Sequence, residues 1–383
     1  MTTSESSTYG QITQEGIERI RSRLGVYYHG IRHVGEITAD AIRTYAQGMG
    51  ERNPLFFDEE YGRKSPYGSI IATPIFLWTV RAVTATNLGG LPGVHSFYGG
   101  SEWEYFRPVR PGDTISATYR PYDVVEKSST YAGRMAIQYA QTLYVDHRAN
   151  AVAKARAWSI RTERRAARER DRFRDVKKPR YTREDLEAIW DAYDREEIGG
   201  ATPRYWEDVQ EGESLPPIVR GPLRVVEIIF GAGRFDAFNT GVGASPGGNH
   251  YYRWSSFRKH LGFAEPDPET GVPDHPHRGH WEETMARLIA LPGIYDLGPQ
   301  RGSWLAQIVT NWMSDHAFVR RFYHELRRFN IEGDTTWVHG KVSRKWIEGD
   351  QHLVECETNC QNQRGETTGM GRVEVILPSR GAE

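Results

Sequence analysis

The sequence predicts an α+β protein made of two similar halves, each with a buried helix and an antiparallel sheet that can wrap around it. Short segments recur in the same order in the two halves of the 383 residues. In each half, an apolar helical stretch is followed by runs in which apolar and polar residues alternate. At about 100 to 200 residues per domain, the length also favours two domains.

The first repeated pair of segments is predicted to be helical. Residues 37–54 read ITADAIRTYAQGMGERNP, and residues 223–239 read LRVVEIIFGAGRFDAFN. Each segment carries an aromatic residue six positions before an acid, namely Tyr45 and Glu51 in the first half and Phe230 and Asp236 in the second.

The second repeated pair is a Gly-Asp-Thr turn, at 112–114 and at 333–335. The two turns are farther apart in the chain than the two acids are. Residues 240–279 have no counterpart in the first half and account for the difference. An ancestral duplication followed by one long insertion explains both spacings.

Between the acid and the turn, each half has a stretch predicted to be a buried helix, Thr73–Ala85 and Gly298–Met313. Neither stretch has a polar face, which favours burial on most sides. After each turn, period-2 alternation predicts antiparallel strands. They are TISATYRPYDVVEK, GRMAIQYAQTLYVD and AVAKARAWSIRTE in the first half, and TTWVHGKVSRKWIE, HLVECETNCQNQ and GMGRVEVILPS in the second.

A charge-dense stretch, 161–180, separates the halves and is expected to be solvated. After it, Thr182 is expected to cap a helix whose apolar residues share one face: Leu186, Ile189, Trp190 and Tyr193. GGATP then breaks the chain. We therefore place an N-terminal domain at 10–165, a charged linker with a helix at 166–203, and a C-terminal domain at 204–383 with the insertion 240–279.

The composition argues against several classes of partner. The net charge of −1 gives no electrostatic case for nucleic acid or an acidic membrane surface. Two cysteines rule out a disulfide framework and favour a reducing cytoplasm. The polar N-terminal segment is not a signal peptide, and no apolar run reaches the length of about 18 residues that a membrane span needs.

Together these features resemble the MaoC-like (R)-specific enoyl-CoA hydratases and acyl dehydratases. The resemblance covers about 15–160 and 200–380. It is carried by the duplication, the Gly-Asp-Thr turns and an acid-x-Asn-Pro-x-x-x-acid loop made by Glu51, Asn53, Pro54 and Asp58. It implies two hotdog domains in tandem, a double hotdog in which an antiparallel sheet wraps a central helix. Two such domains form a pseudo-dimer, so a monomer would suffice, although a homodimer or a heteromeric hydratase remains open.

The family motif reads Asp-x-Asn-Pro-x-His-x-Asp. In the first half Phe56 stands at the histidine position, and because phenylalanine cannot transfer a proton, this copy is expected to be degenerate. In the second half the resemblance assigns Asp236 to the acid position and His280 to the histidine position, with most of the insertion between them. Asp274, six residues before His280, is the alternative acid.

The resemblance implies hydration of a 2-enoyl thioester and the reverse dehydration of a 3-hydroxyacyl thioester. Asp236 and His280 would share the proton transfer, because imidazole titrates near neutral pH. A backbone N–H at a helix start would stabilise the thioester oxyanion. The family analogy favours Gly298; since Pro299 cannot donate, Gln300 is the alternative. The thioester carrier, CoA or an acyl carrier protein, stays open, and a role in fatty acid or lipid metabolism follows.

The insertion carries aromatic and basic residues that are candidates for substrate binding. They could cover an acyl chain or hold a CoA phosphate, or they could pack as a surface excursion. The candidate residues are Asn239, Tyr251, Tyr252, Arg253 and Trp254.

Three alternatives accompany this interpretation. A metal site could form from Asp274, His275, His277, His280 and His250, but this spacing is not specific for zinc, so we expect no metal and no cofactor beyond the thioester substrate. The chain could instead be a catalytically inactive acyl-CoA-binding partner subunit of a heteromeric hydratase. It could also be a hotdog thioesterase.

Overall fold

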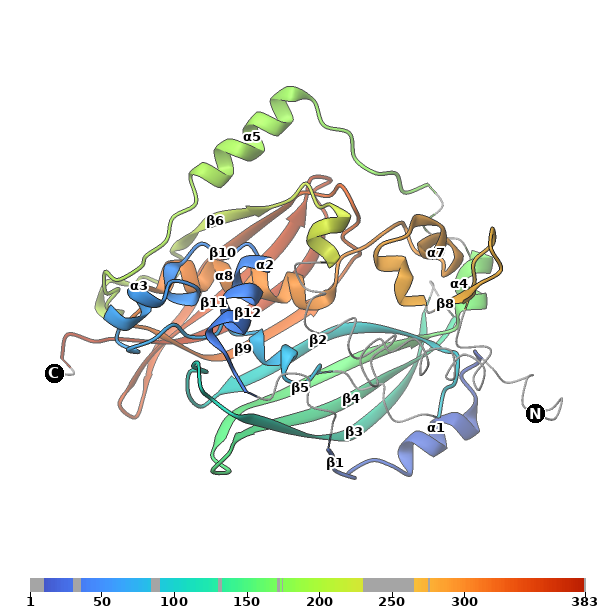
Figure 1. Cartoon of the computed structure of the whole chain (residues 1–383), viewed down its shortest axis with the longest axis horizontal. Coiled ribbons are helices and arrows are strands. Elements are labelled where there is room, and N and C mark those ends of the chain that lie inside the picture. Colours follow the sequence, from blue (N-terminus) through green and yellow to red (C-terminus); the bar gives the residue numbers. More distant parts are fainter. Residues whose placement is uncertain are drawn as a thin grey trace.

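The computed structural model describes residues 10–29, 36–83, 90–129, 133–170, 173, 175–229, 265–274 and 276–381. Within these ranges, ten strands form one antiparallel sheet (Figure 1). The strands of the first half are β1 (Tyr28–His29), β2 (His95–Tyr105), β3 (Ile115–Ser129), β4 (Gly133–Asp146) and β5 (Ala151–Thr162). Those of the second half are β6 (Ser214–Arg220), β9 (Phe318–Leu326), β10 (Thr336–Glu348), β11 (Gln351–Asn362) and β12 (Thr367–Leu377).

The strand order has an internal symmetry. It runs β1-β3-β4-β5-β2-β9-β12-β11-β10-β6, so the second half repeats the order of the first in reverse, and β2 pairs with β9 in the middle. Each half is a five-stranded sheet, and the two join edge to edge. This is the predicted double hotdog fold.

The repeated sequence segments make the same backbone contacts in both halves. The Ile37 amide donates to the aspartate carbonyl of the first Gly-Asp-Thr turn at 2.7 Å, and the turn glycine donates back to Ile37 at 2.7 Å. Leu223 makes the same pair with the second turn, at 2.9 and 2.6 Å. The two turns therefore hold equivalent segments against equivalent sheet edges.

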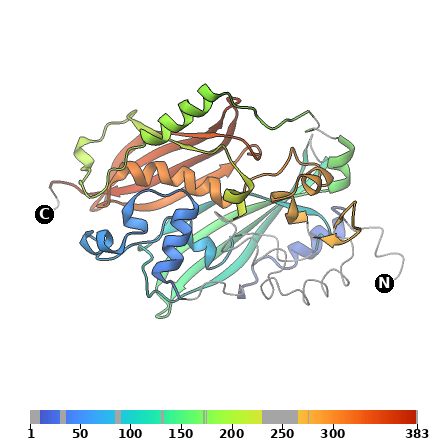
Figure 2. The same cartoon turned by 45° about the horizontal axis from the view of Figure 1, so that its top comes forward.

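The predicted central helix of the second half is α8 (Gly298–Met313), and every residue from Pro299 to Met313 is buried. Figures 1 and 2 show α8 inside the curve of the second half-sheet, with α2 (Ala39–Gly48) beside it. Hydrogen bonds join the two helical segments: Tyr45 and Ser303 share one at 3.1 Å, and Trp304 donates to the Met49 carbonyl at 3.2 Å.

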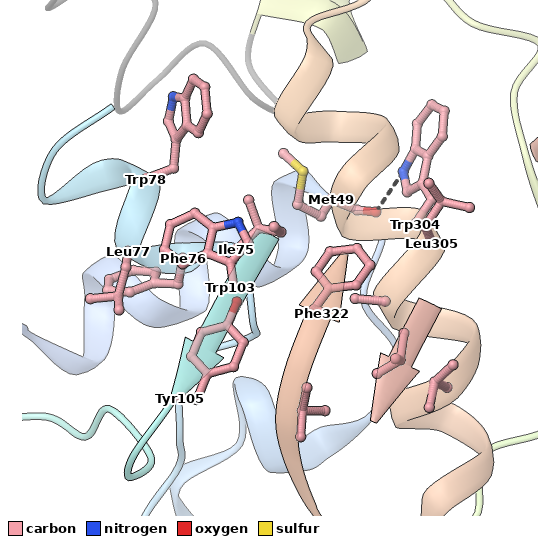
Figure 3. Close-up of a cluster of buried hydrophobic side chains, with 14 of the residues drawn as sticks. Met49, Ile75, Phe76, Leu77, Trp78, Trp103, Tyr105, Trp304, Leu305 and Phe322 are labelled. Atoms are coloured by element: carbon pink, nitrogen blue, oxygen red, sulfur yellow. Dashed lines mark hydrogen bonds between the residues drawn. The ribbon is translucent and has the colours of Figure 1, made fainter. Parts of the chain in front are cut away.

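The helix predicted at Thr73–Ala85 is wrong for the part of it that is described, which contains only the 3₁₀ turn η2 (Phe76–Thr79). β-branched residues weaken helix propensity here, and distant side chains occupy the carbonyls. The Tyr105 hydroxyl donates to the Pro74 carbonyl, and the Tyr144 hydroxyl donates to the Arg81 carbonyl at 2.7 Å. Figure 3 shows the side chains around η2 packed against those of β2, with a residue of β9 beyond them.

The charge-dense stretch 161–180 is only partly solvated. Arg161 lies at the end of β5, is buried, and donates to the Gln138 side chain at 2.7 Å and to nearby carbonyls. Arg164, the first residue of α4 (Arg164–Arg170), is also buried and donates to the Gly93 carbonyl at 2.7 Å. The start of this stretch therefore belongs to the fold, which the charge pattern did not predict.

The predicted linker helix is α5 (Arg183–Asp194), capped by Thr182 through a capping box with Asp185. Its predicted apolar face is only partly correct, because Ile189 is buried but Trp190 is 46% exposed, with the Arg183 guanidinium 5.1 Å from its ring. Figure 2 shows α5 along the outside of the second half-sheet.

The remaining elements are short. They are α1 (Gln14–Arg21), η1 (Pro54–Phe56), α3 (Glu59–Lys64), η3 (Trp206–Asp208), β7 (Glu265–Pro266), β8 (Pro273–Asp274), η6 (Pro276–His280) and α7 (Glu283–Leu288). Among the helices described, none is long and apolar enough to cross a bilayer.

Candidate functional site

His280 and Phe56 occupy equivalent places in the repeat. Phe56 is the last residue of the 3₁₀ turn η1, and α3 begins three residues later; His280 is the last residue of η6, and α7 begins three residues later. Both helices have six residues, and an acid stands at the N-cap of each. The second half therefore presents an imidazole where the first half has a phenyl ring.

The His280 ring is buried, with 8% of the residue exposed, and its orientation is defined by one hydrogen bond. Nδ1 lies 2.8 Å from the Tyr295 carbonyl oxygen. Because a carbonyl only accepts, Nδ1 must carry the proton, and in the neutral ring Nε2 is then a proton acceptor. Burial first, and then the nearby His277 ring, hold the pKa of His280 well below its usual value. The ring is therefore neutral at pH 7.

The start of α8 lies close to this histidine along the chain. The Gln300 amide donates to the Leu297 carbonyl at 2.9 Å, and Pro299 has no N–H. Of the two donors considered, the Gln300 amide is thus engaged within the fold, and Gly298 stays the predicted oxyanion donor. A side chain at Gly298 would clash, because an added Cβ would lie 2.3 Å from Cδ1 of Tyr98 in the first half.

Aromatic rings from three separate segments surround this region. Phe329 contacts Phe97 of β2, Phe173 of the linker and Tyr295, with ring centroids 5.5, 5.4 and 5.6 Å apart. Tyr295 in turn lies 3.8 Å from the His280 ring, centroid to centroid. The sequence analysis missed these residues, since the only signal for them is a high overall content of aromatic residues.

The two residues of a buried ion pair, Asp296 and Arg301, lie on either side of the first residue of α8. The Asp296 carboxylate lies 2.6 Å from Nε of Arg301, with 0% and 4% of the two side chains exposed. Burial raises the pKa of Asp296 to about 6, although the Arg301 charge acts to lower it. The sequence analysis did not single out this pair.

Several predicted site residues lie outside the described part of the chain. They are Asp236, Asn239, Tyr251, Tyr252, Arg253 and Trp254. Asp274 is described only for its backbone, which pairs with Glu265. The acid that would accompany His280 is therefore still a prediction. Among the residues whose side chains are described, no group of three or more histidines, cysteines or acids is arranged to hold a metal ion.

In the first half, the acid of the motif is bound within the fold. Glu51 is buried and accepts from the amides of Arg52 and Asn53 at 3.0 and 3.1 Å. The Asn53 side chain accepts from the Leu55 amide at 3.0 Å and donates to Asp315 at 3.0 Å. Burial raises the pKa of Glu51. Glu51 and Asn53 are thus engaged in structural contacts within this loop.

A small, mostly apolar cavity of about 50 Å³ lies beside Phe56. Its walls come from the segment before η2, the turn after β2, and the junction of α8 with β9. Phe56, at the position equivalent to His280, lines this cavity, and its phenyl ring cannot transfer a proton.

Comparison with known proteins agrees with this architecture. Residues 23–155 match the model of the FAS1-like dehydratase domain region. A UPF0336 protein of Streptomyces avermitilis is 28% identical over 103 residues, 26% of this chain and 66% of that protein. A 3-hydroxybutyryl-CoA dehydratase of Methylorubrum extorquens is 30% identical over 80 residues, 21% of this chain and 50% of that protein. The chain thus spans less than two thirds of the length of these relatives.

Another relative, named "Probable enoyl-CoA hydratase alpha subunit", comes from Thermomonospora curvata and is 27% identical over 141 residues, 32% of this chain and 44% of that protein. Among solved structures, a MaoC-like dehydratase superposes with a TM-score of 0.65 at 14% identity, covering 94% of this chain and all of that one. A MaoC-like dehydratase from Phytophthora capsici gives 0.51 at 12% identity, covering 95% and 99%. Residues 23–155 are therefore similar to a FAS1-like dehydratase region, and nearly the whole chain shares the fold of the MaoC-like dehydratases.

Proposed function

We propose that this protein hydrates a 2-enoyl thioester of CoA and, in reverse, dehydrates the 3-hydroxyacyl thioester, with His280 in proton transfer. The observation that carries the proposal is the state of His280. It is a buried, neutral imidazole whose Nδ1–H donates to the Tyr295 carbonyl, at the place where the degenerate half has Phe56. The names of the relatives, an enoyl-CoA hydratase subunit and a 3-hydroxybutyryl-CoA dehydratase, support this reaction class.

In the hydration direction, Nε2 of His280 accepts a proton from water, and the water oxygen forms a bond to Cβ of the enoyl group. The electron pair of the C=C bond moves toward the thioester, and the Gly298 amide stabilises the charge on its oxygen. Cα then takes the proton held on Nε2 of His280, which returns the ring to its neutral form, so that H and OH have been added across the double bond. Asp236 remains the proposed partner acid, which would orient His280 or the water.

The test is turnover of crotonyl-CoA and a longer enoyl-CoA, followed by loss of the enoyl absorbance. His280→Ala and Asp236→Asn are each expected to lower kcat by about two to four orders of magnitude with the fold intact. Glu51→Gln, the matched change in the degenerate half, is expected to leave kcat within about twofold. If the wild-type protein binds enoyl-CoA without turnover, or if Glu51→Gln is the inactivating change, the proposal is wrong.

A second candidate is an acyl-CoA-binding partner subunit, favoured by Phe56 in the first half and by the relative named as an alpha subunit. It predicts binding of crotonyl-CoA by calorimetry, no loss of absorbance, and appearance of activity only with a second chain. A thioesterase would instead release free CoA in the same reaction mixture, detected by a thiol reagent.

A further inference from the structure

The Asp296–Arg301 ion pair connects the start of α8 to two surrounding segments. The Asp296 amide donates to the Asn330 carbonyl at 3.0 Å. The Arg301 guanidinium donates to the carbonyls of Arg328 and Thr368, both at 2.6 Å. The pair therefore links the beginning of α8 to the turn after β9 and to β12.

Two groups of the candidate site lie beside or between the two charges in the sequence. Tyr295, whose carbonyl holds His280, immediately precedes Asp296, and Gly298 follows it by two positions. A shift of the Asp296 backbone would therefore move both the acceptor that orients His280 and the Gly298 amide. Catalysis is sensitive to such shifts, since a displacement of about 1 Å can lower a rate about a hundredfold.

The degenerate half provides an internal comparison. There the Ala72 amide donates to the Val109 carbonyl at 2.9 Å, the counterpart of the bond from Asp296 to Asn330. Ala72 thus takes the place of Asp296, and Leu77, five residues later, takes that of Arg301. This half builds an equivalent five-stranded sheet without the two charges.

Burial of both charges carries a desolvation free energy that opposes folding. Ion pairs that replace apolar residues in an interior are often neutral or destabilising, because desolvation offsets their attraction. The first half has alanine and leucine at the equivalent places, in a segment that forms a 3₁₀ turn instead of a long helix. A charged pair that occurs in the half with the histidine, and not in the half with Phe56, is better explained by the site than by stability.

We propose that Asp296 and Arg301 are positioning residues for the reaction, which hold the Tyr295–Gly298 segment so that His280 and the Gly298 amide face one thioester. This inference rests on the proposed function. Neither residue transfers a proton; both act through the backbone that carries the reacting groups.

The experiment compares kcat and KM for crotonyl-CoA among Asp296→Asn, Arg301→Lys and the double variant Asp296→Asn/Arg301→Gln. The single changes are expected to lower kcat about 10- to 100-fold with KM within about twofold. The double variant contains no unpaired buried charge and is expected to recover most of its melting temperature, while kcat stays low. Arg301→Lys keeps the charge but loses the carbonyl contacts, so it tests whether charge alone is enough.

The matched control is Glu196→Gln. Glu196 pairs with Arg220 in the second half, and 0% and 6% of those side chains are exposed, which is close to the burial of the Asp296 pair. The Arg220 guanidinium donates to the Gly50 carbonyl, which belongs to the degenerate loop and not to the candidate site. Glu196→Gln is therefore expected to lower the melting temperature without lowering kcat.

The outcomes are distinguishable. If the double variant regains both stability and kcat, or if kcat falls equally in Glu196→Gln, the pair has only a structural role and the inference is overturned. If the wild-type protein itself has no turnover, the proposed function fails before this comparison begins.

Discussion

We expect the free energy of unfolding to fall steeply between pH 6.5 and pH 5, because several histidines are buried in their neutral form. Burial lowers the pKa of His324 to about 3, with the Arg301 charge adding to the effect, and burial lowers that of His277 to about 4. His95 and His280 shift in the same direction. An unfolded histidine takes up a proton near pH 6.5, whereas these folded ones do not.

The sign and size follow from linkage. The unfolded state binds more protons below pH 6.5, so the stability is complete above that pH and is lost as the pH falls toward the folded pKa. Each buried histidine lowers the free energy of unfolding by about 1.4 kcal/mol per pH unit below pH 6.5, or by about 2 kcal/mol at pH 5. Asp296 opposes this: its pKa is raised to about 6, so protonation favours the fold by about 1.4 kcal/mol at pH 5. When the opposing effect of Asp296 is subtracted from the effects of His277 and His324, the free energy of unfolding falls by about 2 to 3 kcal/mol. This is a large share of a typical stability of about 5–15 kcal/mol.

His324 is the best group for testing this reasoning. It lies in β9, fully buried, with Nε2 at 3.0 Å from the Tyr98 hydroxyl. The assay is urea unfolding followed by tryptophan fluorescence, at constant ionic strength between pH 7.5 and pH 5. His324→Gln is expected to lose about 2 kcal/mol less than the wild type over the range from pH 6.5 to pH 5. An identical loss in the two proteins would show that His324 does not remain neutral in the fold, and would refute the argument.

Three further predictions are simpler. Gly298→Ala is expected to lower the melting temperature and to lower kcat at least tenfold, since its methyl group would overlap the Tyr98 ring; activity near wild type would contradict the packing at this point. Cys356 and Cys360 are buried, and burial raises the pKa of the Cys360 thiol to about 12 and that of Cys356 as well, so a thiol reagent is expected to label both only after unfolding. If residues of the insertion bind the substrate, deleting 241–273 is expected to raise KM or abolish activity while the chain still folds, and unchanged kinetics would exclude that role.

Much of the fold could be predicted from the sequence, because its signals are local. The range of α8 was predicted correctly, since sixteen residues without a polar face must be buried on all sides. The strands that follow each Gly-Asp-Thr turn were recognised by alternation. Thr73–Ala85 looked just as apolar, yet its carbonyls are taken by Tyr105 and Tyr144, which come from strands much later in the chain. Propensity alone cannot anticipate such a competition.

The candidate site was predictable only in part. The contrast between Phe56 and His280 can be read from the motif and from the residues that follow each of them. The aromatic contacts of Phe329 involve three segments far apart in the sequence, so no local pattern indicates them. The Asp296–Arg301 pair looks like two ordinary surface charges until the structure shows that both are buried.

By itself, the sequence predicted two hotdog domains in tandem, which the structure confirms, and assigned an imidazole to the motif position of the second half alone. These properties depend on residue type and spacing along one segment. The tertiary structure decided which nitrogen of His280 is free to accept a proton, which strand of the first half faces the start of α8, and which charges are removed from water. Those properties depend on the approach of residues that lie far apart in the chain, and burial and hydrogen bonding take their values only when the chain is folded.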